Sequence, residues 1–216
     1  MTTAESMNRN NEEDNHNVSP EQVRRGRRMA LLLFAIGFGP MVLATIMYYT
    51  GWMNPTAQSN NGVLLNPPVP VAELQLQGAG GMPLEDRFGP ELEEPEWMMM
   101  VVAGDCEAAC EDLLYLTRQV NIALGKNANR VNRSAWLGNV SDDLAARWPS
   151  EYSSMETLEL TDGAEPSWPP GVNPDTQPRI LVVDPFGNVI MHYGSEHTGK
   201  QMLEDLKQLL KLSQIG

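Results

Sequence analysis

The pattern of apolar and polar positions divides the chain into an uncharged N-terminal run, a polar connecting stretch and a mixed C-terminal region. Residues 29–52 contain no charged side chain. A helix of this length reaches roughly 36 Å, which is enough to cross a bilayer. A cleaved signal peptide is the competing interpretation, but its apolar core is usually about 7–15 residues and a small-x-small cleavage site follows it. We therefore predict an uncleaved transmembrane helix over residues 29–52.

Short apolar runs and amphipathic segments follow from residue 93 onwards. Residues 97–103 are continuously apolar, which is typical of a strand buried on both faces. Apolar residues recur at helical spacing between Leu113 and Leu124, so a helix is predicted directly after this strand. Further strands are predicted at 130–137, 155–160, 178–184 and 188–193, and further helices at 141–148 and from 198 onwards. The resulting order is strand, helix, strand, helix, then a hairpin and a last helix.

Asn, Gln, Gly and Pro dominate residues 53–92, which predicts an extended tether. Within it, the alternating residues 71–76 indicate a short edge strand. The predicted organisation is therefore a polar tail over 1–28, a membrane helix over 29–52, the tether over 53–92 and a folded domain over 93–216.

Charge decides the orientation and excludes one class of partner. The 216 residues carry 15 basic and 28 acidic side chains, a net charge of −13, which argues against binding nucleic acid through its phosphates. Four arginines at positions 24, 25, 27 and 28 precede the apolar run, so the positive-inside rule places the N-terminus in the cytoplasm and residues 53–216 on the far side. That outer part has 10 basic and 23 acidic side chains, which suits a basic partner or cations, although solubility alone also explains it.

The candidate chemistry lies in the two cysteines, Cys106 and Cys110, at the start of the predicted helix. A helix N-terminus favours the thiolate, whereas the neighbouring Asp105 and Glu107 oppose it. Three interpretations stay open: a structural disulfide, thiol–disulfide exchange, and Cu(I) handling, since two thiolates suit Cu(I). A third copper ligand would come from His197 or His192, while His16 lies across the membrane.

Other classes of site lack their motifs. The sequence contains no P-loop, no Gly-x-Gly-x-x-Gly after a strand, no His-x-x-x-His pair and no Gly-x-Ser-x-Gly elbow. Met98, Met99 and Met100 invite a copper interpretation, but residues in a strand alternate between its two faces, so we predict that they belong to the core.

A strand, a cysteine pair at the head of a helix, a proline before an apolar hairpin, a glycine and a final helix together resemble the thioredoxin fold. The three residues between the cysteines are similar to the spacing in Sco-type copper chaperones of cytochrome oxidase. A closer resemblance is to a group of single-pass, thioredoxin-like proteobacterial proteins associated with cytochrome c oxidase assembly; it is carried by the segments GDCEAAC, LLYLTRQVNIALGK, ILVVDPFGNVIMHYG and LLKLSQIG. The resemblance implies an α/β domain, with a central mixed sheet and flanking helices, anchored in the inner membrane and facing the periplasm.

The resemblance also implies the site residues. Sco-type proteins bind copper through both cysteines and a histidine before the hairpin, whereas this chain has Thr176 at that position. Pro178 stands where a thioredoxin carries its cis-proline, which favours thiol chemistry. The implied catalytic residues are Cys106, Cys110 and Pro178. The candidate metal ligands are Cys106 and Cys110, with His197 as the third in place of the missing family histidine.

The sequence therefore predicts an accessory protein for cytochrome c oxidase biogenesis. It would act by thiol–disulfide exchange, as an oxidoreductase, or by handling Cu(I), which is the cofactor that the resemblance implies. Its expected partners are the membrane and an oxidase subunit or other assembly factors. The alternative is a non-catalytic scaffold that binds an oxidase subunit and uses the cysteines as a structural disulfide.

Overall fold

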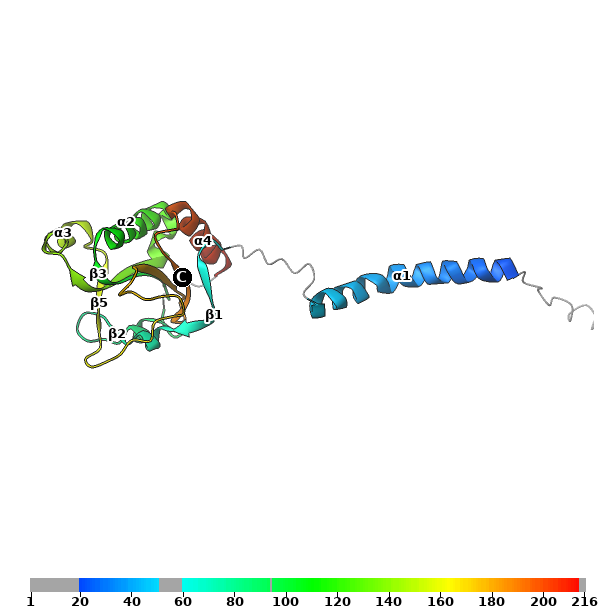
Figure 1. Ribbon diagram of the computed structural model, residues 1–216, viewed down its shortest axis with the longest axis horizontal. Helices are drawn as coiled ribbons and strands as arrows, with labels where there is room; N and C mark the ends of the chain where they lie inside the picture. Colours follow the sequence, from blue (N-terminus) through cyan, green and yellow to red (C-terminus); the bar gives the residue numbers. More distant parts are fainter. Residues whose placement is uncertain (1–19, 51–59, 94, 214–216) are drawn as a thin grey trace, which may run out of the picture. The chain divides into compact units, whose positions relative to one another are not determined.

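A computed structural model describes residues 20–50, 60–93 and 95–213, which belong to two separate units (Figure 1). The first unit contains the helix α1 (Pro20–Thr50), which includes the arginine run as well as most of the predicted span. By length and composition, α1 is the one helix among the described residues that is suited to cross a membrane. Residues 51 and 52 of the predicted span lie outside the described residues.

The second unit is built on a seven-stranded sheet with the order β1-β7-β6-β3-β4-β5-β2. Its central strand, β3, pairs in parallel with β4 and antiparallel with β6, so the sheet is mixed. This confirms the predicted α/β class with a central mixed sheet. The strands are β1 (Val63–Pro70), β2 (Leu76–Gln77), β3 (Trp97–Cys106), β4 (Val131–Val140), β5 (Glu156–Leu160), β6 (Arg179–Val183) and β7 (Asn188–Tyr193).

The methionines of β3 belong to the core, as predicted. Met99 faces one side of the sheet together with Val101, and Met98 and Met100 face the other side. All three methionines are buried. Because β3 is apolar on both faces, each face of the sheet needs a cover.

Three helices cover the first face: α2 (Ala108–Ala123), α3 (Asp142–Glu151) and α4 (Gly199–Leu212). α2 and α4 lie side by side over the sheet (Figure 1). The predicted helix starts are confirmed by their caps. The hydroxyl of Ser141 accepts from the Leu144 N–H at 3.2 Å, and Thr198 with Gln201 forms a capping box that starts α4.

The second face is covered by the segment that the sequence indicated to be a tether. Residues 60–92 belong to the folded unit, where they contribute β1, β2 and two short 3-10 helices, η1 (Val71–Leu74) and η2 (Leu84–Arg87). Leu74 and Leu84 are fully buried there and pack in one cluster with Met98 and Met100. The physical reason is that β3 has an apolar second face that the helices do not reach. The alternating stretch at 71–76 is a 3-10 turn leading into the two-residue edge strand β2.

A proline-rich sequence can form β1 because this strand is at the edge of the sheet. Pro67, Pro68 and Pro70 have no N–H to donate, which a central strand could not accommodate. The register with β7 shifts between Leu64 and Val69, where Pro67 and Pro68 interrupt the pairing.

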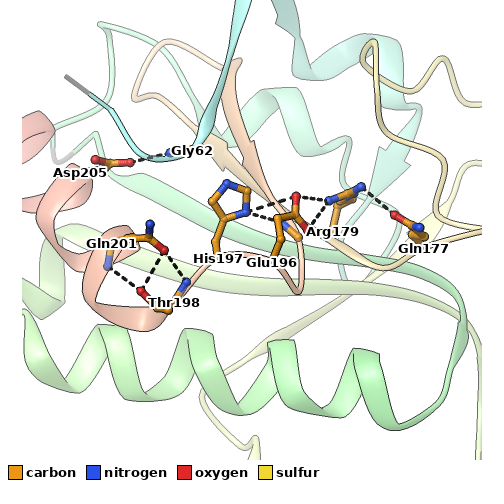
Figure 2. A network of polar contacts seen from close by, with 9 residues as sticks. Gly62, Gln177, Arg179, Glu196, His197, Thr198, Gln201 and Asp205 are labelled. Carbon is orange, nitrogen blue, oxygen red and sulfur yellow. Dashed lines mark hydrogen bonds and ion pairs between the residues drawn. The ribbon is translucent and has the colours of Figure 1, made fainter. Parts of the chain in front are cut away.

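The carboxylate of Asp205 joins the start of β1 to α4. It is buried, and accepts hydrogen bonds from the Asn61 N–H at 2.8 Å, the Gly62 N–H at 2.9 Å and the Tyr193 hydroxyl at 2.9 Å. Figure 2 shows the contact with Gly62. The folded unit is therefore closed by a contact between its two sequence ends.

Candidate functional site

Cys106 and Cys110 form a disulfide where β3 meets α2, with their Cα atoms 5.0 Å apart. The predicted strand ends at residue 103, but β3 continues to Cys106 because β4 runs beside it as far as Val140. Cys110 lies in the first turn of α2, and its N–H donates to the carbonyl oxygen of Glu107 at 2.9 Å. Cys106 is 5% exposed and Cys110 is 0% exposed, so both cysteines are buried and Cys106 is the more exposed of the two.

A cavity of about 310 Å³ adjoins the disulfide. Cys110 and Ala109 form one wall, and the loop before β6 forms the opposite wall with Pro174, Asp175, Thr176, Gln177 and Pro178. Pro178, the proline that the resemblance singled out, lines the same cavity as Cys110. The cis peptide bond among the described residues is Asn66–Pro67, so the bond before Pro178 is trans, which departs from the thioredoxin pattern.

Gly104 allows this loop to approach the disulfide. Its N–H donates to the Pro174 carbonyl at 2.9 Å. A Cβ at position 104 would lie 2.5 Å from the Asp175 Oδ1 and 3.0 Å from the Asp175 Cα, which is closer than real Cβ atoms approach. The absence of a side chain at Gly104 therefore sets the distance between the two walls of the cavity.

A polar network holds the Gln177 side of the loop (Figure 2). Arg179 on β6 donates to the Gln177 Oε1 at 2.8 Å and to the Glu196 Oε1 at 2.8 Å. The pKa of the Glu196 carboxyl lies below its ordinary value. Burial raises this pKa, but a backbone hydrogen bond and the Arg179 guanidinium lower it by more. Arg179 therefore links the cavity wall to the segment that leads into α4.

The two candidate histidines, His192 and His197, do not join the cysteines in a metal-binding cluster among the described residues. His197 accepts the Gly194 N–H on Nδ1 at 3.1 Å, and its ring packs edge-on against Tyr193. His192 is buried in β7, and neither of its ring nitrogens has a hydrogen-bond partner among the described residues. Within residues 20–50, 60–93 and 95–213, no three His, Cys, Asp or Glu side chains gather as metal ligands. The predicted set of Cys106, Cys110 and His197 is not brought together.

The surroundings of the disulfide are acidic. Asp105, Glu107 and Asp175 line the cavity and are exposed. Asp105 accepts a hydrogen bond from the Asn139 side chain at 2.7 Å. The guanidinium of Arg147 on α3 contacts three carboxylates, those of Glu111, Asp143 and Glu151. The carboxylates of Asp105, Glu107 and Asp175 would disfavour an anionic group in the cavity and favour a cationic one.

Two family models match the chain. Residues 97–213 match the model described as the transmembrane-like, thioredoxin-like, C-terminal domain, and residues 20–51 match its N-terminal, transmembrane-like domain. The chain belongs to this family. The first match covers the disulfide, both walls of the cavity and the closing hairpin and helix, while the second covers α1.

Solved structures of similar proteins have low sequence identity to this family member. Copper-bound ScoI from Bradyrhizobium japonicum is 16% identical with a TM-score of 0.42, over 62% of this chain and 96% of that one. Apo Sco1 from Thermus thermophilus is 15% identical with a TM-score of 0.48, over 71% and 99%. A thio-disulfide isomerase from Thermus thermophilus is 18% identical with a TM-score of 0.43, over 71% and 98%. A search among curated proteins found no match.

Sequence reasoning missed three residues that shape this site: Gly104, Asp175 and Arg179. Their roles depend on contacts with a loop or strand far away in the chain. The available signal for Gly104 was a glycine two residues before Cys106, because a glycine inside a strand often marks a close backbone approach.

Proposed function

We propose that this chain is a membrane-anchored thiol–disulfide exchange protein of the periplasm that serves cytochrome c oxidase assembly. The observation that carries the proposal is a disulfide bordered by an open cavity. A disulfide that only staples the fold needs no such opening, whereas exchange requires a path for a partner sulfur. The cavity meets the pair at Cys110, and Cys106 is the more exposed residue of the two, so we take Cys106 as the sulfur that a partner attacks.

The exchange reaction balances between the chain and one partner dithiol. A partner thiolate attacks the Cys106 Sγ, the bond to the Cys110 Sγ breaks, and Cys110 leaves as a thiolate. The second partner thiolate then attacks its own half of the mixed disulfide and releases Cys106. Two electrons pass from the partner to the chain, and the two protons of the partner end on the two cysteines. The reverse sequence reduces a partner disulfide.

The cellular setting of the proposal is supported by the sequence. The four arginines before α1 favour a cytoplasmic N-terminus, which would place residues 53–216 in the periplasm, where disulfides persist. The role in oxidase assembly is supported by the resemblance of the cysteine and hairpin segments to proteins associated with that process. BsSco, described as a member of the Sco family of cytochrome c oxidase assembly proteins, is among the solved structures that the chain is similar to.

A trapping experiment tests the exchange reaction. In cells that express Cys110→Ser, the Cys106 thiol attacks a partner disulfide and the mixed disulfide cannot be resolved, so a covalent complex accumulates on non-reducing gels. Cys106→Ser is the matched control and traps no complex. Absence of a complex with Cys110→Ser, or equal amounts with both variants, would contradict the proposal.

Cu(I) handling is the second candidate, because two thiolates suit Cu(I) and the carboxylates of Asp105, Glu107 and Asp175 line the cavity at Cys110. The protein reduced without oxygen would then bind one Cu(I), and either Cys→Ser variant would lose it. His197→Ala would weaken the complex only if His197 leaves its contact with Gly194 to act as a ligand. His192→Ala is the control, because His192 is a buried residue of β7.

The double Cys→Ser variant distinguishes the scaffold alternative from exchange and from copper handling. In that case the disulfide contributes only by closing a short loop, about 2 kcal/mol, and the variant stays folded. Exchange or copper handling requires oxidase assembly to fail in this variant. Normal oxidase activity with both thiols absent would favour the scaffold.

A further inference from the structure

An apolar groove lies beside the disulfide, between the end of β4 and α3. Its volume is about 300 Å³. Val140 is 39% exposed although it is apolar. The groove is lined by Leu137 and Val140 of β4, by Ala145, Trp148 and Pro149 of α3, and by Thr157 of β5. We call it the α3 groove.

The register of the sheet brings the α3 groove to the cysteines. Val140 and Cys106 are Cα partners on the parallel strands β4 and β3, and Leu137 pairs with Ala103 in the same way. Neighbouring strands are about 4.8 Å apart. A peptide chain seated over Val140 would therefore lie beside the sulfur that the proposed exchange attacks.

The rim of the α3 groove is acidic. Asp142 and Asp143, in the first turn of α3 between the lining residues Val140 and Ala145, are exposed. Asp105, which lines the cavity at Cys110, is exposed as well. The basic residue of this helix, Arg147, is already engaged with carboxylates, including those of Glu111 and Asp143. The groove thus combines an apolar floor with carboxylates that lack an equal number of cations.

We propose that the α3 groove binds an extended, apolar segment of a partner protein, flanked by Lys or Arg and adjacent to the cysteine that exchanges with Cys106. This inference rests on the proposed function and adds the chemical class of the partner. Charge complementarity supports a cationic partner segment over a second copy of this chain, because two copies would bring two acidic rims together. The apolar floor of the α3 groove contributes affinity, and its acidic rim selects a partner segment that carries positive charge.

A binding experiment with thiol-free peptides tests this inference. The full chain is placed in phosphatidylcholine nanodiscs, with empty nanodiscs as the blank. The probe is a fluorescein-labelled hexapeptide of two leucines, a valine and a serine between terminal lysines, and its counterpart carries glutamates in place of the lysines. Binding is followed by fluorescence anisotropy. The lysine peptide is expected to bind at least about tenfold more tightly than the glutamate peptide, and less tightly as salt rises.

Two variants locate the binding site. Val140→Ser removes exposed apolar surface from the groove without disturbing the core and should weaken binding about fivefold. Ile122→Ser makes a comparable change at an exposed position of α2 and should leave binding unchanged. Equal binding by Val140→Ser and the unaltered chain, or equal binding of the two peptides, would overturn the inference. A dimer of the chain that Val140→Ser dissociates would also overturn it, in favour of a second copy.

The probe has no sulfur, so its binding is independent of exchange. Peptide binding without a trapped complex in Cys110→Ser supports the groove and contradicts the proposed function. A trapped complex without peptide binding supports the proposed function and overturns the groove.

Discussion

Asp205 is a buried carboxylate whose hydrogen-bond donors come from both ends of the folded unit. The donor at Asn61 lies 144 residues away in the sequence. Burial, followed by the neighbouring carboxylate, raises the pKa of the Tyr193 hydroxyl, so this group stays protonated and remains a donor. Asp205 therefore joins β1, β7 and α4 through one side chain.

Asp205→Ala should lower the free energy of unfolding by about 3 kcal/mol, because it leaves the buried donors at Gly62 and Tyr193 unpaired and removes the acceptor of the Asn61 N–H. Glu204→Ala is the matched control, since Glu204 is the exposed neighbour on α4, and its effect should stay within about 0.5 kcal/mol. Urea unfolding of the full chain in a mild detergent, followed by circular dichroism, measures both. Similar urea midpoints for the two variants would show that the hydrogen bonds of Asp205 contribute little to stability.

His192 predicts a dependence of stability on pH. Burial, together with the charge of Arg179, lowers the pKa of the His192 imidazole, and Glu196 opposes this in part. The unfolded chain, with a histidine pKa of about 6.5, therefore takes up this proton first as the pH falls. The contribution of His192 is complete above about pH 6.5 and is lost as the pH drops from there through the folded-state pKa.

The unfolding free energy should thus decrease from pH 7.5 to pH 5.5 by a larger amount in the unaltered chain than in His192→Leu, with a limiting slope of about 1.4 kcal/mol per pH unit. Urea titrations at several pH values measure the unfolding free energy of each protein. Subtracting one curve from the other removes the contribution of the carboxylates, which both proteins share. Parallel curves for the two proteins would contradict this assignment.

At the residue scale, the sequence predicted what is local. Cys106, Cys110 and the caps at Ser141 and Thr198 are recognised from their immediate neighbours, and the structure places them as expected. The sequence could not predict the hydrogen bond between Asn61 and Asp205, because a local pattern does not encode a contact across most of the domain.

At the scale of elements, the loop before β6 and the start of α2 act together, because they form the two walls of the cavity. The hydrogen bond from Gly104 to Pro174 fixes the loop at one end, and the Arg179 contact with Gln177 fixes it at the other. The position of this loop therefore determines how closely a partner sulfur can approach.

Gly104→Ala should move the loop away from the disulfide, because its Cβ would clash with the side chain and backbone of Asp175. We expect reduction of the disulfide by dithiothreitol to become several-fold faster and stability to fall by about 1–2 kcal/mol. Alkylation of the released thiols at timed intervals measures the rate. Asp175→Asn removes the charge and keeps the size, and should change the rate by only about twofold. A rate unchanged by Gly104→Ala would show that the loop does not limit access.

Most of the elements were predictable, and the exceptions share one cause. The strands and helices from Trp97 onwards follow from periodicity and caps, since each presents a repeating apolar face. Residues 60–92 have little periodicity, and their prolines indicate an extended linker. The two-sided burial of β3 was the signal that a second cover was required, but the sequence does not say which segment supplies it.

For the whole molecule, the arrangement of charges around α1 predicts the topology. Alkaline phosphatase, which is active only outside the cytoplasm, should be active when fused after Gly216 and inactive when fused after Arg28. Activity assays in intact cells measure this. Activity of the Arg28 fusion, or release of residues 53–216 as a soluble fragment, would contradict an uncleaved anchor.

The two end strands of the sheet have a consequence for copies of this protein that share one membrane. Confinement to a surface raises the frequency with which anchored domains meet, and a long bare strand edge would then template strand-to-strand polymers. Three prolines interrupt the donors of β1, and β2 has only two residues. Both ends of the sheet are therefore poor templates, so we expect neighbouring anchored domains not to join edge to edge.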